Sequence, residues 1–198
     1  MAVSDGAHWD RRYTQLGPTP AEAVGLPDVF APHRAAFPTE GFALDIACGQ
    51  GRTAVWLAER GLTVLGFDIS EVAVEQAAAT ARQRRVADRC RFEVVDLDGG
   101  LPAGPAADVI VCHLFREERL DRALAERLAP GGLLAIAALS EVGSAPGRYR
   151  VRQGALTNAF ADLDVVAADE GSGVAWLLGR RHCSTAADSG APDRARWR

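Results

Sequence analysis

The residues best suited to binding a charged ligand lie at positions 45–52, where the chain reads Asp-Ile-Ala-Cys-Gly-Gln-Gly-Arg. Gly49 and Gly51 have no Cβ atom, so the backbone can turn sharply there and approach a ligand closely. The segment joins an apolar run to an alanine-rich helical stretch, and the free amides at the start of such a helix attract a carboxylate or a phosphate. Two glycines at this spacing are weak evidence alone, but their place between a strand and a helix favours a cofactor-binding loop.

Three aspartates, Asp45, Asp68 and Asp96, end successive apolar, β-branched runs. The carboxyl ends of parallel strands form the edge where open α/β sheets bind ligands, so we expect the three carboxylates to meet there. Asp68 is placed to accept hydrogen bonds from both hydroxyls of a ribose, and Asp96 to accept one from an adenine amino group. A cluster of carboxylates repels a pyrophosphate but tolerates a sulfonium cation with an ammonium group. The pattern therefore favours S-adenosylmethionine over a dinucleotide, although each aspartate alone could be an ordinary turn residue.

The elements that would position these acids alternate along the chain. Strands are predicted at 42–47, 62–68, 90–96, 107–113 and 133–139, and helices at 53–61, 70–84 and 117–128. Ser70 is a good N-cap for the second of these helices. Residues 97–106 are too short and turn-rich for an ordinary crossover helix, and 163–180 predicts a hairpin. The fold class is therefore α/β: a doubly wound, Rossmann-like, seven-stranded, mostly parallel sheet with an antiparallel C-terminal hairpin.

We expect a single domain in three parts. Residues 1–41 form an N-terminal helical cap, with helices near 7–16 and 28–37 that pack over the ligand-binding edge. Residues 42–181 form the core that binds the cofactor. Residues 182–198 have no hydrophobic periodicity and are predicted to be a disordered tail.

Composition narrows the classes of partner. The net charge of -4 gives no reason to expect nucleic acid or an anionic membrane as a partner. There is no apolar stretch of about 18 residues and no signal-peptide pattern, so a cytoplasmic protein is expected. The four scattered cysteines favour reduced thiols over a disulfide framework or a metal site. The pattern makes no prediction about the oligomeric state.

The chain resembles the class I S-adenosylmethionine-dependent methyltransferases. The resemblance covers about residues 41–181 and depends on LDIACGQGR, GFDIS, VVDLDGGLP and LAPGGLLAIA. The N-terminal HWDRRY, GQGR and VVDL are similar to the tellurite-resistance and thiopurine-type enzymes that methylate small molecules. The shortened link between the third and fourth strands departs from the family pattern, and no signature identifies the acceptor.

The resemblance implies roles for individual residues. The expected cofactor-binding residues are Arg12, Tyr13, Asp45, Ala47, Gly49, Gly51, Arg52, Asp68, Ile69, Asp96 and Leu97. Asp45, Ala47 and the two glycines would surround the methionine part of S-adenosylmethionine, and Arg12 or Tyr13 would approach its carboxylate. Asp68 and Ile69 would hold the ribose, and Asp96 and Leu97 the adenine. The alternative for Tyr13, and for Trp9 beside it, is hydrophobic docking of the N-terminal helix.

Methyl transfer from a sulfonium is an in-line displacement that depends mainly on proximity and alignment, so no nucleophilic side chain is required. A general base is needed only for an acceptor that is protonated at the working pH. His113, at the end of the fourth strand, is the candidate catalytic residue, although it could instead be a strand-end histidine bonded to a carbonyl. Arginines 52, 116, 148 and 150 could orient an anionic acceptor, and residues 140–156 could form a lid over it.

The predicted function is therefore methyl transfer from S-adenosylmethionine to a small-molecule acceptor, with S-adenosylhomocysteine as the product. Two alternatives stay open. Residues 49–54 also fit the G-x-G-x-x-A pattern of NAD(P)-dependent oxidoreductases. A non-catalytic module that binds S-adenosylmethionine would carry the same cofactor motifs.

Overall fold

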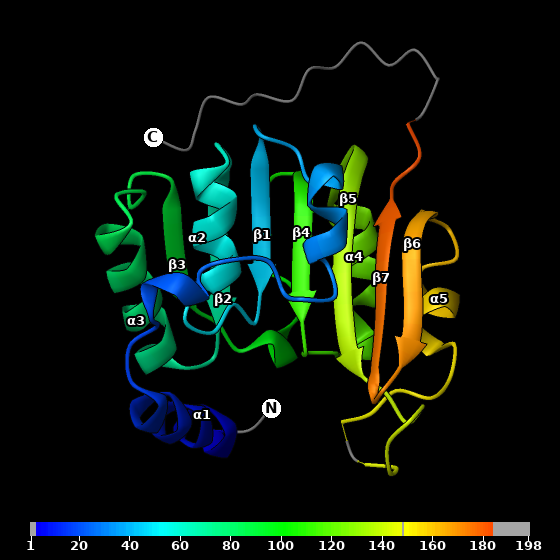
Figure 1. Cartoon of the computed structure of the whole chain (residues 1–198), viewed down its shortest axis with the longest axis horizontal. Helices are drawn as coiled ribbons and strands as arrows, with labels where there is room; N and C mark the ends of the chain where they lie inside the picture. Colours follow the sequence, from blue (N-terminus) through cyan, green and yellow to red (C-terminus); the bar gives the residue numbers. More distant parts are fainter. Residues whose placement is uncertain (1–2, 148, 184–198) are drawn as a thin grey trace.

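Seven strands form one mixed sheet in the computed structural model, which describes residues 3–147 and 149–183 (Figure 1). Their order across the sheet is β3-β2-β1-β4-β5-β7-β6. The five strands from β3 to β5 are parallel, whereas β7 is antiparallel to both β5 and β6. The strands are β1 (Phe42–Ile46), β2 (Thr63–Asp68), β3 (Cys90–Val94), β4 (Ala107–His113), β5 (Leu128–Leu139), β6 (Asp164–Gly171) and β7 (Val174–Arg180). The predicted fold class and its antiparallel C-terminal hairpin are confirmed.

Helices and short 3-10 turns link the strands. The helices are α1 (Val3–Leu16), α2 (Arg52–Glu59), α3 (Glu71–Gln83), α4 (Asp121–Arg127) and α5 (Ala155–Ala159). The 3-10 turns are η1 (Ala21–Ala23), η2 (Ala31–Ala36), η3 (Leu97–Gly99) and η4 (Glu118–Leu120). As predicted, Ser70 caps α3, because its hydroxyl accepts a hydrogen bond from the Ala73 amide at 3.1 Å. Within the described residues, no helix has the length and apolar character needed to cross a membrane.

Apolar side chains are buried on both faces of the sheet, as expected where helices cover a parallel sheet on both sides. Adjacent residues of β4 divide between the two clusters, since successive side chains of a strand point to opposite faces. Val109 belongs to a cluster with Leu57 of α2, whereas Ile110 belongs to one with Leu124 of α4. This packing holds the ends of the central strands in place, and several of the candidate site residues lie at those ends.

One connection follows the prediction, and one strand is longer than predicted. Residues 97–106 contain only the 3-10 turn η3, so no crossover helix lies between β3 and β4. Strand β5 starts at Leu128, five residues before the strand predicted at 133–139. Long-range pairing explains the longer strand: Leu128 pairs with Ala107, and the amide of Gly131 donates to the carbonyl of Arg181 at 2.9 Å.

The two N-terminal segments occupy different sides of the sheet. Helix α1 lies below α3, on the side of the sheet where the parallel strands end, as expected (Figure 1). The second segment forms only the 3-10 turn η2 and packs on a sheet face, where Phe30 and Phe37 are buried. It does not form the expected helix over the ligand edge, because these aromatic side chains are drawn into the apolar cluster around β7, with Phe30 6.1 Å from Trp176. Most of the predicted tail, residues 184–198, lies outside the described residues.

Candidate functional site

The loop after β1 has a backbone path that favours glycine. Ala47, Gly49 and Gly51 have φ angles of 53°, 51° and 72°, all in the left-handed region. The amide of Cys48 donates to the carbonyl of Phe67 at 2.8 Å, which fastens the loop to β2. A Cβ atom on Gly51 would lie 2.8 Å from the Cβ of Ala77, so only glycine fits this contact with α3. The loop therefore makes the sharp turn that its glycines predict and is fastened to β2 and α3.

Asp45 lies at the base of this loop and is 3% exposed. Its carboxylate accepts a hydrogen bond from the amide of Ala54 in the first turn of α2, whereas its buried Oδ2 has no hydrogen-bond partner among the described residues. Burial raises the pKa of Asp45 to about 7, the Ala54 amide opposes this rise, and the negative charge of Asp68 adds to it. A buried acceptor without a partner is costly, and a cationic or hydrogen-bond-donating ligand would satisfy it.

Asp68 ends β2 beside the loop. Its Oδ2 accepts a hydrogen bond from the Gly49 amide at 2.7 Å, and its Oδ1 accepts one from the Ser70 amide at 2.9 Å. Burial raises the pKa of Asp68, while these amides partly offset the rise. Each carboxylate oxygen has two lone pairs, so each can accept a further hydrogen bond from a ligand. The backbone thus fixes the orientation of Asp68 and leaves lone pairs on both of its oxygens.

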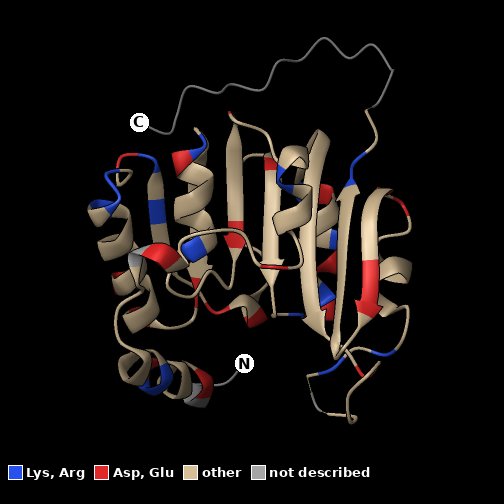
Figure 2. Ribbon diagram, viewed as in Figure 1, with Lys and Arg blue, Asp and Glu red and all other residues tan. Residues whose placement is uncertain are grey.

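The two predicted adenine residues have different surroundings. Asp96 is exposed after β3, and its Oδ1 accepts a hydrogen bond from the Asp98 amide at 2.9 Å. Leu97 is 3% exposed and its side chain belongs to one of the sheet-face clusters, so little of this side chain is available to a ligand. Ile69 lies under α1, because a Cβ atom on Gly6 would be 3.7 Å from its side chain. Acidic residues colour the loops below β1 and β2 in Figure 2.

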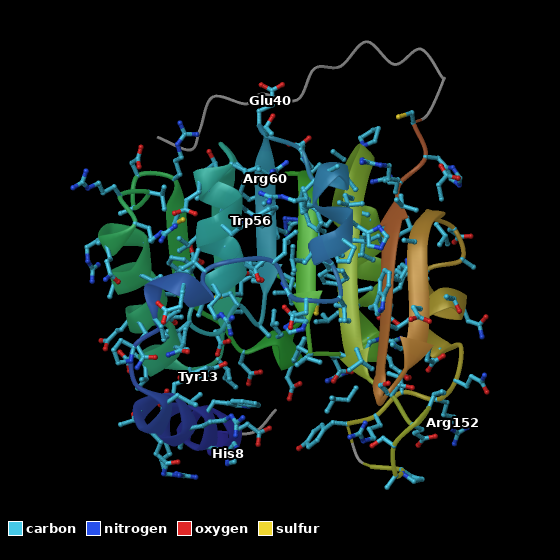
Figure 3. All side chains as sticks on the ribbon, in the orientation of Figure 1. His8, Tyr13, Glu40, Trp56, Arg60 and Arg152 are labelled. Carbon is cyan, nitrogen blue, oxygen red and sulfur yellow. The ribbon has the colours of Figure 1, made fainter. Side chains whose placement is uncertain are left out.

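Helix α1 brings Tyr13 onto the loop (Figure 3). A Cβ atom on Gly49 would lie 2.7 Å from the Tyr13 hydroxyl, and the Trp9 and Tyr13 rings are 5.9 Å apart. Burial, and then the nearby Asp68 and Cys48, raise the pKa of Tyr13, which keeps the phenol protonated. Arg12 is exposed, and its guanidinium lies 5.8 Å from the centre of the Trp9 ring. Of the two residues expected near the cofactor's carboxylate, Tyr13 is the one that touches the loop.

Three polar residues that the sequence prediction did not include hold α1 in place. Asp10 accepts a hydrogen bond from the Ser70 hydroxyl at 2.6 Å. The side-chain amide of Gln76 donates to the Tyr13 carbonyl at 3.3 Å, and that of Gln50 donates to the Gly17 carbonyl at 2.6 Å. Asp10 and Gln50 lie within the HWDRRY and GQGR motifs, but the motifs do not indicate these contacts, since the partners are far apart in sequence.

His113 ends β4 at the same edge. The preceding residue, Cys112, pairs with Ile46, which places His113 beside the start of the loop. Burial lowers the pKa of His113, and the positive charge of Arg52 lowers it further, while Asp28 opposes both. The imidazole makes no hydrogen bond to any residue that the structure describes. A neutral, unbonded imidazole can accept a proton from a bound molecule.

The other basic candidates already have protein partners. Arg52 donates to the Ala23 carbonyl at 2.5 Å, and Arg116 forms a buried ion pair with Asp121. Arg150 donates to the carbonyls of Ser140 and Gly173, at 2.7 and 3.1 Å. Arg148 lies outside the described residues. These contacts tie loops together, so they leave less of each guanidinium for an acceptor.

A family profile described as "Methyltransferase domain" matches residues 43–132. The chain is 35% identical over 100 residues to the methyltransferase GfsG of Streptomyces halstedii, which covers 48% of this chain and 36% of that protein. It is 38% identical over 99 residues to the ribosomal protein L11 methyltransferase of Syntrophotalea carbinolica, covering 48% of this chain and 31% of that protein. The match thus spans about a third of the length of these curated relatives.

Solved structures share the fold. Magnesium protoporphyrin IX methyltransferase (ChlM) from Synechocystis PCC 6803 with bound SAH has a TM-score of 0.67 at 19% identity, covering 88% of this chain and 94% of that one. TehB from Haemophilus influenzae has a TM-score of 0.65 at 18% identity, covering 89% and 66%. The tellurite-resistance type that the N-terminal motif predicts is thus among the structural neighbours.

Proposed function

We propose that the chain is a class I S-adenosylmethionine-dependent methyltransferase, as the methyltransferase profile over residues 43–132 supports, and that it methylates a small-molecule acceptor. The observation that carries the proposal is the pair of aspartates at the ends of β1 and β2. Asp45 has a buried oxygen without a protein partner, and Asp68 is held by two backbone amides with lone pairs to spare. Both fit a cofactor that has a cationic end and a ribose, and both would repel a pyrophosphate.

In this proposal each predicted residue has a physical task. The unpartnered Asp45 oxygen attracts the ammonium group of the methionine part, while Ala47, Gly49 and Gly51 let that part lie against the backbone. Tyr13 closes over it, with Arg12 and Arg52 nearby. Asp68 accepts the ribose hydroxyls beside Ile69, and Asp96, with the backbone of Leu97, receives the adenine. When bound, S-adenosylmethionine would supply a methyl group attached to a sulfonium sulfur, and that sulfur would become a neutral thioether as the methyl group passes in line to the acceptor.

His113 is the proposed general base for an acceptor that must lose a proton. Its lowered pKa keeps the imidazole neutral near pH 7, and Arg52 would stabilise the anion formed by deprotonation. Beside it, Leu114 is 49% exposed, which favours an acceptor with an apolar part. A relative that methylates a ribosomal protein makes a protein acceptor the alternative.

Calorimetric titration with S-adenosylmethionine, S-adenosylhomocysteine and NAD in parallel tests the cofactor. We expect micromolar binding of the first two and none of NAD, and binding of NAD alone would overturn the proposal. A screen of hydroxyl, thiol and amine acceptors, read out as formation of S-adenosylhomocysteine, tests the reaction. Ribosomal protein L11 belongs in the screen, since turnover with it alone would replace the small-molecule acceptor. Cofactor binding without turnover on any acceptor would instead support a non-catalytic module.

A further inference from the structure

The contact between α1 and the start of α3 centres on Asp10. Its Oδ1 accepts hydrogen bonds from the Ser70 hydroxyl at 2.6 Å and from the Val72 amide at 3.3 Å. The first amides of a helix have no partner within the helix and carry a partial positive charge, so a carboxylate is favourable there. Asp10 is therefore a second cap of α3, supplied by a different helix.

Ser70 connects this cap to the proposed ribose-binding residue. Its hydroxyl donates to Asp10 while its amide donates to Asp68 Oδ1 at 2.9 Å. Asp68 in turn accepts the Gly49 amide at 2.7 Å, and Gly49 is the residue that Tyr13 covers. Asp10 and Tyr13 are three residues apart on one face of α1. The contacts thus form a closed ring from α1 through Ser70, Asp68 and Gly49 back to α1.

The far end of α1 is attached separately. Gln76 donates to the Tyr13 carbonyl and Gln50 to the Gly17 carbonyl, and Gln50 also donates to the Gln76 side chain at 2.7 Å. Gly17, directly after the helix, has a φ of 70°, a conformation that suits a pivot. Loss of the Asp10 contact would remove the hydrogen bonds from α1 to the start of α3 and leave those at this end, so the helix could move away from the loop more easily.

We propose that Asp10 is a positioning residue that holds α1 closed over the bound cofactor and thereby limits the rate at which the cofactor leaves. The inference depends on the proposed function, because it requires the cofactor to bind beside Asp68 and Gly49. Asp10 itself touches α3 and not the cofactor, so it acts through the position of Tyr13. Its removal is expected to affect dissociation of the cofactor product more than the methyl transfer step.

The test compares Asp10→Ala and Asp10→Asn with the control Glu71→Ala. Glu71 is exposed in the first turn of α3, so its replacement removes the same charge from the same helix end without touching α1. Dissociation of radiolabelled S-adenosylhomocysteine is followed after a chase with unlabelled ligand. We expect about tenfold faster dissociation for Asp10→Ala, the effect of losing one charge-assisted hydrogen bond. Asp10→Asn, which keeps an acceptor oxygen, should restore part of the loss, and Glu71→Ala should match the wild type.

Hydrogen exchange of the α1 amides without ligand provides an independent readout. Exchange should be faster in Asp10→Ala than in the wild type and Glu71→Ala, while circular dichroism and the thermal midpoint verify that each variant is folded. Wild-type dissociation and exchange in a folded Asp10→Ala would overturn the role of Asp10 and leave the proposed function intact. A wild-type protein that does not bind S-adenosylhomocysteine would overturn the proposed function, and the exchange measurement would still decide whether Asp10 holds α1.

Discussion

Replacement of Asp45 by asparagine should make the protein more stable at neutral pH while it weakens cofactor binding. Burial raises the pKa of Asp45 from 3.8 to about 7, so the ionised form is disfavoured in the folded state. A difference of about three pKa units corresponds to about 4 kcal/mol, an upper limit for the cost of ionising this group in the fold. Asparagine keeps an oxygen for the Ala54 amide and removes the charge.

The sign follows from which state holds the proton. Below about pH 4 Asp45 is protonated in both states and contributes no pH dependence. Between about pH 4 and 7 the unfolded chain is ionised and the folded chain is not, so this group makes stability fall as the pH rises. Above about pH 7 both states are ionised and the loss is constant. Asp45→Asn should therefore match the wild type near pH 4 and exceed it by up to about 4 kcal/mol at pH 8.

Urea unfolding of both proteins across this pH range measures the difference. The exposed Asp88→Asn serves as the control and should follow the wild type throughout. Binding should show the opposite dependence: wild-type affinity for S-adenosylhomocysteine should rise through about pH 7, by up to about tenfold per unit, as Asp45 ionises and attracts the ammonium group. A stability difference that does not change with pH would refute the account of Asp45.

Three further predictions concern single side chains. Asp68→Ala should weaken cofactor binding at least tenfold by calorimetry, and unchanged affinity in a folded variant would remove the ribose assignment. Ala47→Gly should stabilise the protein by about 1 kcal/mol in urea unfolding, because Ala47 has a φ of 53°, and a loss of stability would contradict that reasoning. With a hydroxyl acceptor, turnover should fall in acid as His113 becomes protonated, with a midpoint below its ordinary pKa because burial lowers that value. His113→Gln should abolish this limb of the pH profile, and an identical profile would exclude His113 as the base.

The parts of the site that could be predicted from sequence are those that local pattern determines. Gly49 and Gly51 follow a strand and precede a helix, and Asp68 ends the next strand, so their meeting at one edge follows from the parallel arrangement. The Ser70 cap is local as well, since the hydroxyl bonds to an amide three residues later. These assignments need only the strand and helix periodicities and the rule that parallel strands align their ends.

Contacts between distant segments could not be predicted in this way. Asp10 and Ser70 are 60 residues apart, and nothing near Asp10 in the sequence indicates that it caps another helix. The segment around Phe30 and Phe37 illustrates the same limit, because its position on a sheet face depends on the pocket that other elements provide. Similarly, pairing with Ala107 and Arg181 extends β5 through a Pro-Gly-Gly segment that resembles a turn.

By itself, the sequence determines the alternation of elements, the glycine loop and the acids at the strand ends, because each depends on neighbouring residues or on a period of two or 3.6. Only the tertiary structure decides which acid keeps an unpartnered oxygen and which is held by amides, since burial and long-range hydrogen bonds set the state of each carboxylate. Asp45 and Asp68 look alike in the sequence, yet the fold leaves Oδ2 of Asp45 without a partner and gives both oxygens of Asp68 a backbone donor.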